Sequence, residues 1–211
     1  MLKYIYLLIV LNFISCGSTK ITNSWKNDAY INYQPKKILV LGITPNKEAR
    51  TIYENELKFE LIKRNILACE GFNILEPDFS NINQVEQEIE NEVEKLTELG
   101  FDAILLATIK GFEEKIPFDG NIFKNNDSFY GFENYYFLNQ DIYNDRNYFE
   151  KYKVFHLEVS LFNLTYENKK TLVWLATYDI VDPKKIEKTT KQCIVKILKT
   201  LEKEAIIPLI N

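Results

Sequence analysis

Apolar residues in the first half of the chain form blocks that alternate between strand-like and helix-like spacing. The run 36–43, apolar after its two lysines, predicts a buried strand, and 46–65 continues at helical spacing with acidic residues early and basic residues late. A short strand is predicted at 66–69 and an amphipathic helix at 83–99, ended by a glycine. The run 101–109 then predicts a further buried strand.

The second half of the chain has a different pattern. Apolar and polar residues alternate through 152–164, which predicts an antiparallel strand with one face exposed, and a second strand near 171–178 completes a hairpin. A final helix is predicted from Pro183 to about Ala205. The order is therefore β-α-β-α-β, a long loop, then β-β-α. This order predicts an α/β fold with a mixed sheet (α+β) in a single layered domain, residues 35–211.

The first fifteen residues read as a signal peptide. Lys3 precedes an apolar run from Tyr4 to Ile14, interrupted only by Asn12. As a helix, this run would span about 16 Å, well short of the ~30 Å hydrocarbon core of a bilayer. The length is typical of a cleaved signal rather than a permanent membrane helix. A buried N-terminal helix is the alternative interpretation.

The residues Phe13-Ile14-Ser15-Cys16 resemble the lipobox of bacterial lipoproteins. The resemblance implies cleavage before Cys16, a lipid on its sulfur and a membrane as partner, with 16–34 as a tether. No acidic residue directly follows Cys16, which by the sorting rules of Gram-negative lipoproteins implies outer-membrane retention with the domain facing the periplasm. A plain secretory signal, with Cys16 incidental, is the alternative.

The predicted hairpin at 161–176, with its Leu172-Val173-Trp174 run, resembles a hairpin found in many envelope lipoproteins. Together with 37–40 and 100–105, it is similar to a family of uncharacterised bacterial lipoproteins. Their periplasmic domain is similar to the N-terminal domain of TolB and to the curli-secretion lipoprotein. The resemblance implies an adaptor or assembly factor, but its motifs consist of core and turn residues, which indicate a fold and not a reaction.

Composition adds one constraint on partners. The chain is 46% hydrophobic and 27% charged, which is typical of a globular protein, and its formal charge is −4. Removing the signal peptide removes Lys3 and no acidic residue, so the mature chain is more acidic still. A nucleic-acid groove needs a clustered positive field, and we therefore expect no nucleic-acid partner.

The segment 111–152 is unusual because it is long, has no clear periodicity and is rich in aromatic, Asn and Asp residues. Such rings give contact area at little entropic cost, as in recognition loops, and they also stack on sugars. The alternative is a hairpin extension or flap that covers the sheet. The candidate recognition surface, for an envelope protein or a glycan, is Phe129, Tyr130, Phe132, Tyr135, Tyr136, Phe137, Tyr143 and Tyr148.

Residues that could support catalysis are sparse. His156 is the single histidine, and beside Glu158 it could act as a base or metal ligand, although a lone surface histidine is usually ordinary. The acidic residues 113–114 and 86–94 could form paired carboxylates, but the run 86–94 lies on the outer face of a predicted helix and is expected to be solvated surface. No Gly-x-Gly-x-x-Gly, Walker, Gly-x-Ser-x-Gly or His-Glu-x-x-His motif occurs.

The leading prediction is therefore a non-enzymatic binding or assembly module without cofactor or metal. A carbohydrate- or peptidoglycan-binding lipoprotein is the first alternative and a hydrolase the second. Cys69 and Cys193 remain once Cys16 is lipidated, and the sequence leaves open whether they form a disulfide or stay buried thiols.

Overall fold

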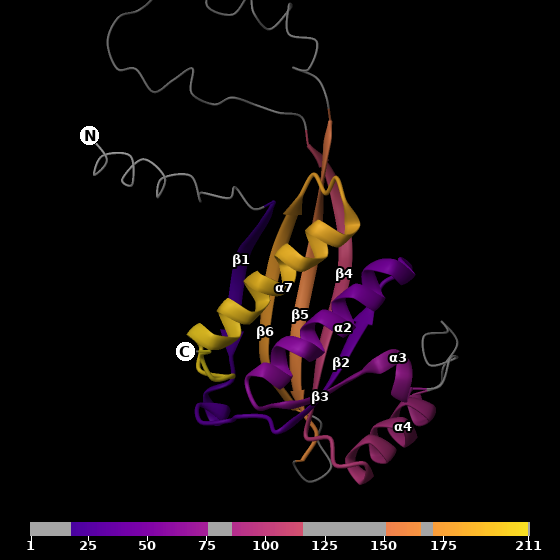
Figure 1. The fold of residues 1–211 in the computed structure, drawn as a ribbon, viewed down its shortest axis with the longest axis vertical. Coiled ribbons are helices and arrows are strands. Elements are labelled where there is room, and N and C mark those ends of the chain that lie inside the picture. The colour runs from indigo at the N-terminus through magenta and orange to yellow at the C-terminus, as the bar shows by residue number, and fades with distance from the viewer. Residues whose placement is uncertain (1–17, 76–85, 116–150, 166–170, 211) are drawn as a thin grey trace, which may run out of the picture.

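The computed structural model describes residues 18–75, 86–115, 151–165 and 171–210. They form one domain around a single six-stranded sheet (Figure 1). The strand order is β1-β6-β5-β4-β2-β3. The strands are β1 (Thr19–Lys26), β2 (Lys37–Ile43), β3 (Leu67–Glu70), β4 (Ala103–Lys115), β5 (Tyr152–Asn163) and β6 (Thr171–Val181).

The sheet is mixed, as the sequence pattern predicts. β2 runs parallel to β3 and to β4, because helices connect these strands. β4, β5, β6 and β1 pair antiparallel. The predicted α+β architecture in a single layered domain is thus confirmed.

Helices cover both faces of the sheet, but unequally. The helix α2 (Lys47–Lys63) and the helix α7 (Ile186–Lys203) lie side by side on one face (Figure 1). The helix α4 (Glu86–Glu98) and the short helix α3 (Gly71–Ile74) lie with the parallel half of the sheet, and a 3-10 turn, η2 (Asp28–Tyr30), follows β1. Within the described ranges, no helix has the length and apolar character needed to span a membrane.

The larger apolar core lies between the sheet and the α2–α7 pair. Leu57 of α2 and Ile197 of α7 meet Leu105 and Trp174 of the sheet, and all four side chains are fully buried. Burying a side chain of this size contributes about 1.5–3 kcal/mol. This cluster therefore holds the two helices to the sheet.

The smaller core lies on the other face, where Val93 and Leu96 of α4 pack with Leu39 of β2. This core does not reach the antiparallel half of the sheet. There the same face carries polar pairs, such as the hydroxyls of Thr22 and Thr177 at 2.7 Å. The alternating pattern of the sequence predicts this exposed face correctly.

The predicted tether needs correction. Residues 19–26, which the sequence pattern places in the tether, form the edge strand β1 paired with β6. Its side chains are exposed except for buried Thr19 and half-buried Lys26, and its register shifts between Ile21 and Asn23. Backbone hydrogen bonds to β6, rather than an apolar face, hold this strand, so no hydrophobic periodicity reveals it.

Two element boundaries also differ from the predicted ones. The last helix begins at Ile186 instead of Pro183, because Lys185 keeps the extended backbone of an N-cap. The strand β4 continues six residues beyond the predicted end at Ile109 and includes Gly111, whose φ is 156°. Both ends of the predicted loop 111–152 therefore belong to the β4–β5 pair.

We expect replacement of Gly100 by alanine to lower the free energy of unfolding by about 1–2 kcal/mol. Gly100 has a φ of 81°, and its N–H bonds to the carbonyl of Thr97 at 2.9 Å while the N–H of Phe101 bonds to that of Leu96 at 3.0 Å. These are the paired bonds of a Schellman cap, which requires a left-handed residue. Urea denaturation measures the loss, and Gly100→Asn should retain more stability than Gly100→Ala. Equal stability of all three proteins would contradict this account.

Candidate functional site

The aromatic recognition surface cannot be placed, because its residues lie outside the described ones. This applies to Cys16 as well. The aromatic residues concerned are Phe129, Tyr130, Phe132, Tyr135, Tyr136, Phe137, Tyr143 and Tyr148. Their proposed role stays a prediction, and the described residues on either side show where the segment leaves and rejoins the sheet.

The aromatic segment leaves and rejoins the sheet at one end of a long hairpin. Lys115 of β4 pairs with Tyr152 of β5, and three residues nearer the domain Phe112 pairs with Phe155. The rings of this second pair lie 5.5 Å apart, and Phe112 is 55% exposed. The Lys153 ammonium lies 5.0 Å from the Phe112 ring centroid, a cation–π distance. The base of the segment thus already carries an exposed aromatic side chain.

The described chain begins at this same end of the sheet. Thr19 pairs with Ile180, and Ile180 pairs with Phe155, so these residues form one row across three strands. Two contacts fix the first residues to α7: Ser18 Oγ donates to Gln192 Oε1 at 3.0 Å, and Thr19 Oγ1 lies 3.3 Å from Cys193 Sγ. β1 therefore begins at the same end of the sheet at which β4 ends and β5 begins (Figure 1).

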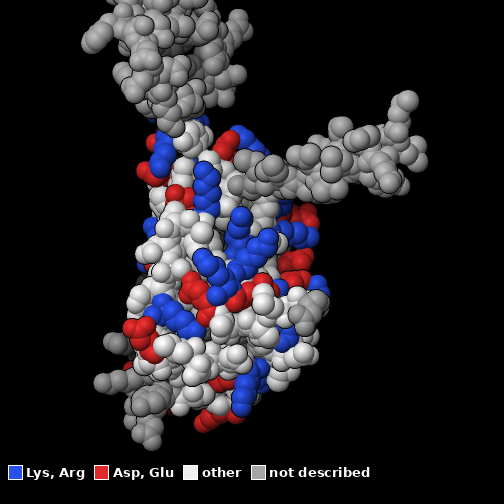
Figure 2. All heavy atoms as spheres, turned by 90° about the vertical axis from the view of Figure 1, so that its left-hand side faces the viewer, with Lys and Arg blue, Asp and Glu red and all other residues white. Residues whose placement is uncertain are grey.

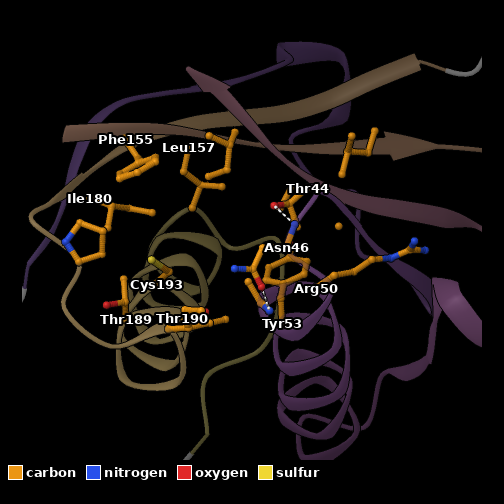
Figure 3. Close-up of a pocket in the computed structure, with 17 residues that line it drawn as sticks. Thr44, Asn46, Arg50, Tyr53, Phe155, Leu157, Ile180, Thr189, Thr190 and Cys193 are labelled. Atoms are coloured by element: carbon orange, nitrogen blue, oxygen red, sulfur yellow. Dashed lines mark hydrogen bonds between the residues drawn. The ribbon is translucent and has the colours of Figure 1, made fainter. Parts of the chain in front are cut away.

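A pocket of about 240 Å³ opens between the first turns of α2 and α7 and the sheet beneath them (Figure 3). In Figure 3, Phe155, Leu157 and Ile180 on the strands face Thr189, Thr190 and Cys193 on α7. The α2 side is formed by Asn46, Ala49, Arg50 and Tyr53. The remaining lining residues are Gly42, Ile43, Thr44, Ala107, Ile109, Pro183, Ile186. The lining is mostly apolar.

Glu54 fixes the α2 wall of this pocket. Its carboxylate is fully buried and accepts hydrogen bonds from the Gly42 N–H at 3.0 Å and the Phe72 N–H at 2.9 Å. Arg50 Nε donates to the same carboxylate at 2.8 Å. One side chain therefore joins α2, the end of β2 and the start of α3. The sequence signal for this role is that Glu54 lies on the apolar stripe of α2 together with Leu57 and Leu61.

The polar groups near the pocket are few and mostly engaged. Asn46 caps α2, its Oδ1 accepting from the Ala49 N–H at 2.9 Å, and the N–H of Asn46 donates to Thr44 Oγ1 at 3.3 Å. The Tyr53 hydroxyl is buried without a hydrogen-bond partner among the described residues, and burial raises its pKa. The pocket therefore resembles an apolar binding cavity more than a reaction centre.

The two remaining cysteines are free thiols. Cys193 is buried in the core beneath α2 and α7, whereas Cys69 of β3 packs against the core on the opposite face. The sheet separates them, so the disulfide that the sequence left open does not form. Burial raises the pKa of the Cys193 thiol, which keeps it protonated and unreactive.

His156 lies among carboxylates on the exposed sheet face. Its Nδ1 lies 2.9 Å from Asp179 Oδ1 and its Nε2 lies 3.5 Å from Glu113 Oε1, with the ring side chain 42% exposed. The predicted partner Glu158 instead pairs with Lys110 at 3.6 Å. None of the described contacts of the imidazole involves a hydroxyl or thiol nucleophile, and no cluster of potential metal ligands occurs among the described residues.

The two adjacent carboxylates at 113–114, which the sequence offers as a possible carboxylate pair, each lie in an exposed ion pair instead. Glu113 pairs with Lys115 at 2.7 Å, and Glu114 with Lys151 at 3.6 Å. Acidic and basic side chains also intermingle on the side of the domain that carries β1 and α7 (Figure 2). Exposed pairs of this kind contribute about 0–1 kcal/mol. The absence of a nucleic-acid partner stays a prediction.

Comparison with known proteins gives structural likeness only. No family model and no curated protein matches the chain. The PelC dodecamer from Paraburkholderia phytofirmans is 12% identical with a TM-score of 0.41, covering 87% of this chain and 95% of that one. The lipoprotein GNA1162 from Neisseria meningitidis is 10% identical with a TM-score of 0.41, covering 80% of this chain and 99% of that one.

Identity and TM-score are both low in these comparisons, so the proposals below rest on this chain's own residues. The resemblance to TolB and the curli-secretion lipoprotein stays a prediction.

Proposed function

We propose that this protein is an envelope lipoprotein, anchored through lipid on Cys16, whose domain is a non-enzymatic binding or assembly module. One observation carries the proposal: the chain enters the domain at the end of the sheet from which the aromatic segment departs. The row from Thr19 through Ile180 to Phe155 establishes this. Anchor and contact segment would then act on the same side of the domain.

The connection between Cys16 and the first described residue, Ser18, is short, so a lipid on Cys16 would keep the domain close to the membrane. Two residues of extended chain span about 7 Å, and Ser18 is hydrogen-bonded to α7. A lipid on Cys16 would hold the domain against the bilayer, since each buried methylene contributes about 0.8 kcal/mol and several chains together give durable anchoring. The partner of the aromatic segment would be an envelope protein close to the same membrane. Outer-membrane retention and a periplasmic orientation are part of this proposal.

Two observations disfavour the hydrolase alternative. The described contacts of His156 are with carboxylates, and the Cys193 thiol is buried and protonated. Hydrolysis by a nucleophile and base would need an accessible hydroxyl or thiol beside the histidine. Glycan binding by the aromatic segment stays the alternative binding function, supported by the exposed ring of Phe112 at its base.

The anchor is tested by replacing Cys16 with serine. We expect the wild-type protein to incorporate a radiolabelled or clickable palmitate in growing cells and to sediment with membranes. Cys16→Ser should lose the label, because serine has no sulfur to accept the diacylglyceryl group, and when it is exported behind a signal peptide whose cleavage does not need lipidation it should become soluble. Cys69→Ser serves as the matched control and should keep both properties. Label on Cys16→Ser, or none on the wild type, would refute the anchor.

The binding function is tested by crosslinking in intact cells. A photoreactive residue at Tyr136 should capture one envelope protein reproducibly, identified by mass spectrometry. The same residue at Ile31 provides the control, because Ile31 is 62% exposed and follows the opposite end of β1. Equal capture from both positions, or none from Tyr136 in a folded and anchored protein, would reject the protein interface. Glycan arrays would then test the alternative.

A further inference from the structure

We propose that the pocket between α2 and α7 binds a straight fatty-acyl chain. Its walls are built from the sheet residues Phe155, Leu157 and Ile180 on one side and from α7 and the Tyr53 ring on the other. An apolar cavity of this kind gains free energy from an apolar occupant and little from water. Among the described residues, no charged side chain other than Arg50 lines it, and Arg50 Nε is already paired with buried Glu54.

The volume sets the size of the occupant. A dry apolar cavity of about 150 Å³ holds benzene, a molecule of six carbons. At about 240 Å³, this pocket has room for about nine carbons by the same packing. A sugar or nucleotide of that size would bring several hydroxyls that the walls cannot satisfy. An unbranched hydrocarbon segment meets both requirements.

The rim can receive the polar end of such a molecule. Thr44 and Asn46 stand at one side of the pocket and Thr189 and Thr190 at the other (Figure 3). The Asn46 amide oxygen caps α2, and its N–H₂ group is left to donate. Hydroxyl and amide donors suit a carboxylate, an ester or an amide carbonyl equally well. The acyl chain would therefore enter tail first.

The position of the pocket allows two sources for an acyl chain. Cys193 lines the pocket and touches Thr19, the first residue of β1. Three extended residues reach about 10 Å, so Cys16 lies within that distance of Thr19. One source is therefore the lipid on Cys16, which rests on the proposed function, and the other is a free fatty acid. The chemistry of the pocket is the same for both.

The first experiment uses the chain from residue 16 onward with Cys16→Ser, exported behind a signal peptide whose cleavage does not need lipidation, so that no attached lipid is present. We expect cis-parinaric acid, a linear polyene fatty acid, to gain fluorescence on binding with a stoichiometry of one and to be displaced by decanoate better than by hexanoate. Ala49→Phe places a ring into the pocket from α2 and should weaken binding at least about tenfold, as expected for excluding about two methylene groups. Lys47→Phe adds the same ring to the same turn of α2, outside the lining, and should bind like the parent.

Several outcomes would overturn the proposal. One is the absence of saturable binding by a chain that circular dichroism shows to be folded. Another is equal binding of the probe by Ala49→Phe and the parent. The third is a loss of binding in Lys47→Phe as large as the loss in Ala49→Phe. The source is decided with the lipidated protein in detergent-free nanodiscs. If the Cys16→Ser protein binds the probe and the lipidated protein does not, the pocket is assigned to the protein's own lipid. If both proteins bind the probe, the pocket is assigned to a free fatty acid. Palmitate labelling tests the anchor separately, so failure of either idea leaves the other measurable.

Discussion

Replacing Glu54 with alanine is expected to lower the free energy of unfolding by about 3–5 kcal/mol, the cost of breaking a buried ion pair on one side. Glu54 is fully buried and satisfies the N–H groups of Gly42 and Phe72 together with Arg50. Its removal leaves three donors without an acceptor and opens a cavity beside the pocket. Urea denaturation followed by circular dichroism measures the loss.

The control for this substitution lies one half-turn further along α2. Glu56 is 44% exposed and pairs with Lys191 at 3.2 Å, so Glu56→Ala should cost no more than about 1 kcal/mol. Glu54→Gln keeps the shape and one acceptor oxygen and should fall between the two. A loss below 1 kcal/mol for Glu54→Ala would contradict the account of this carboxylate as the junction of α2, β2 and α3.

Replacing Trp174 with alanine is expected to cost about 3–5 kcal/mol as well, through lost burial and the cavity that remains. Trp174 is fully buried in the core, and its indole N–H donates to Glu204 Oε2 at 2.8 Å. That bond joins β6 to the end of α7. Trp174→Phe keeps most of the apolar area and should cost less, since it loses chiefly the hydrogen bond and part of the ring volume.

The chain contains two tryptophans, which gives the test an optical readout. Trp25 is 47% exposed on β1, so Trp25→Phe should change stability by no more than about 0.5 kcal/mol and leave Trp174 as the single emitter. We expect blue-shifted emission from that variant, moving to the red on unfolding. Emission already at long wavelength in the native state would show that Trp174 is not enclosed.

The sequence predicts those elements whose side chains reveal a buried face. The runs that become β2 and β4, and the stripes of α2 and α7, are apolar because they form the cores on either side of the sheet. β1 could not be predicted in the same way. It is an edge strand with a bulge and mostly exposed side chains, and what holds it is backbone pairing to a strand about 150 residues away along the chain.

The candidate site was harder to predict than the fold. The pocket is formed where β2, β4, β5, β6 and the first turns of two helices converge, and no single segment carries its pattern. Thr189 and Cys193 on α7 line the same pocket as Asn46 and Ala49 on α2 only because the two helices lie side by side. The reverse holds for His156: the sequence identifies it as a candidate, but only the structure shows that its neighbours are Asp179 and Glu113.

The pairing of β1 with β6 also sets an order in time. Among the described residues β1 is the first strand, yet its partner β6 at Thr171–Val181 is the last of the described strands to be synthesised. Until β6 has emerged, the residues of β1 lack the strand with which they pair. Under the proposed function, enzymes that attach a lipid and cleave before Cys16 would therefore act on a chain whose β1 is still unpaired. Pairing of β1 with β6 would then bring the folded domain close to the proposed anchor.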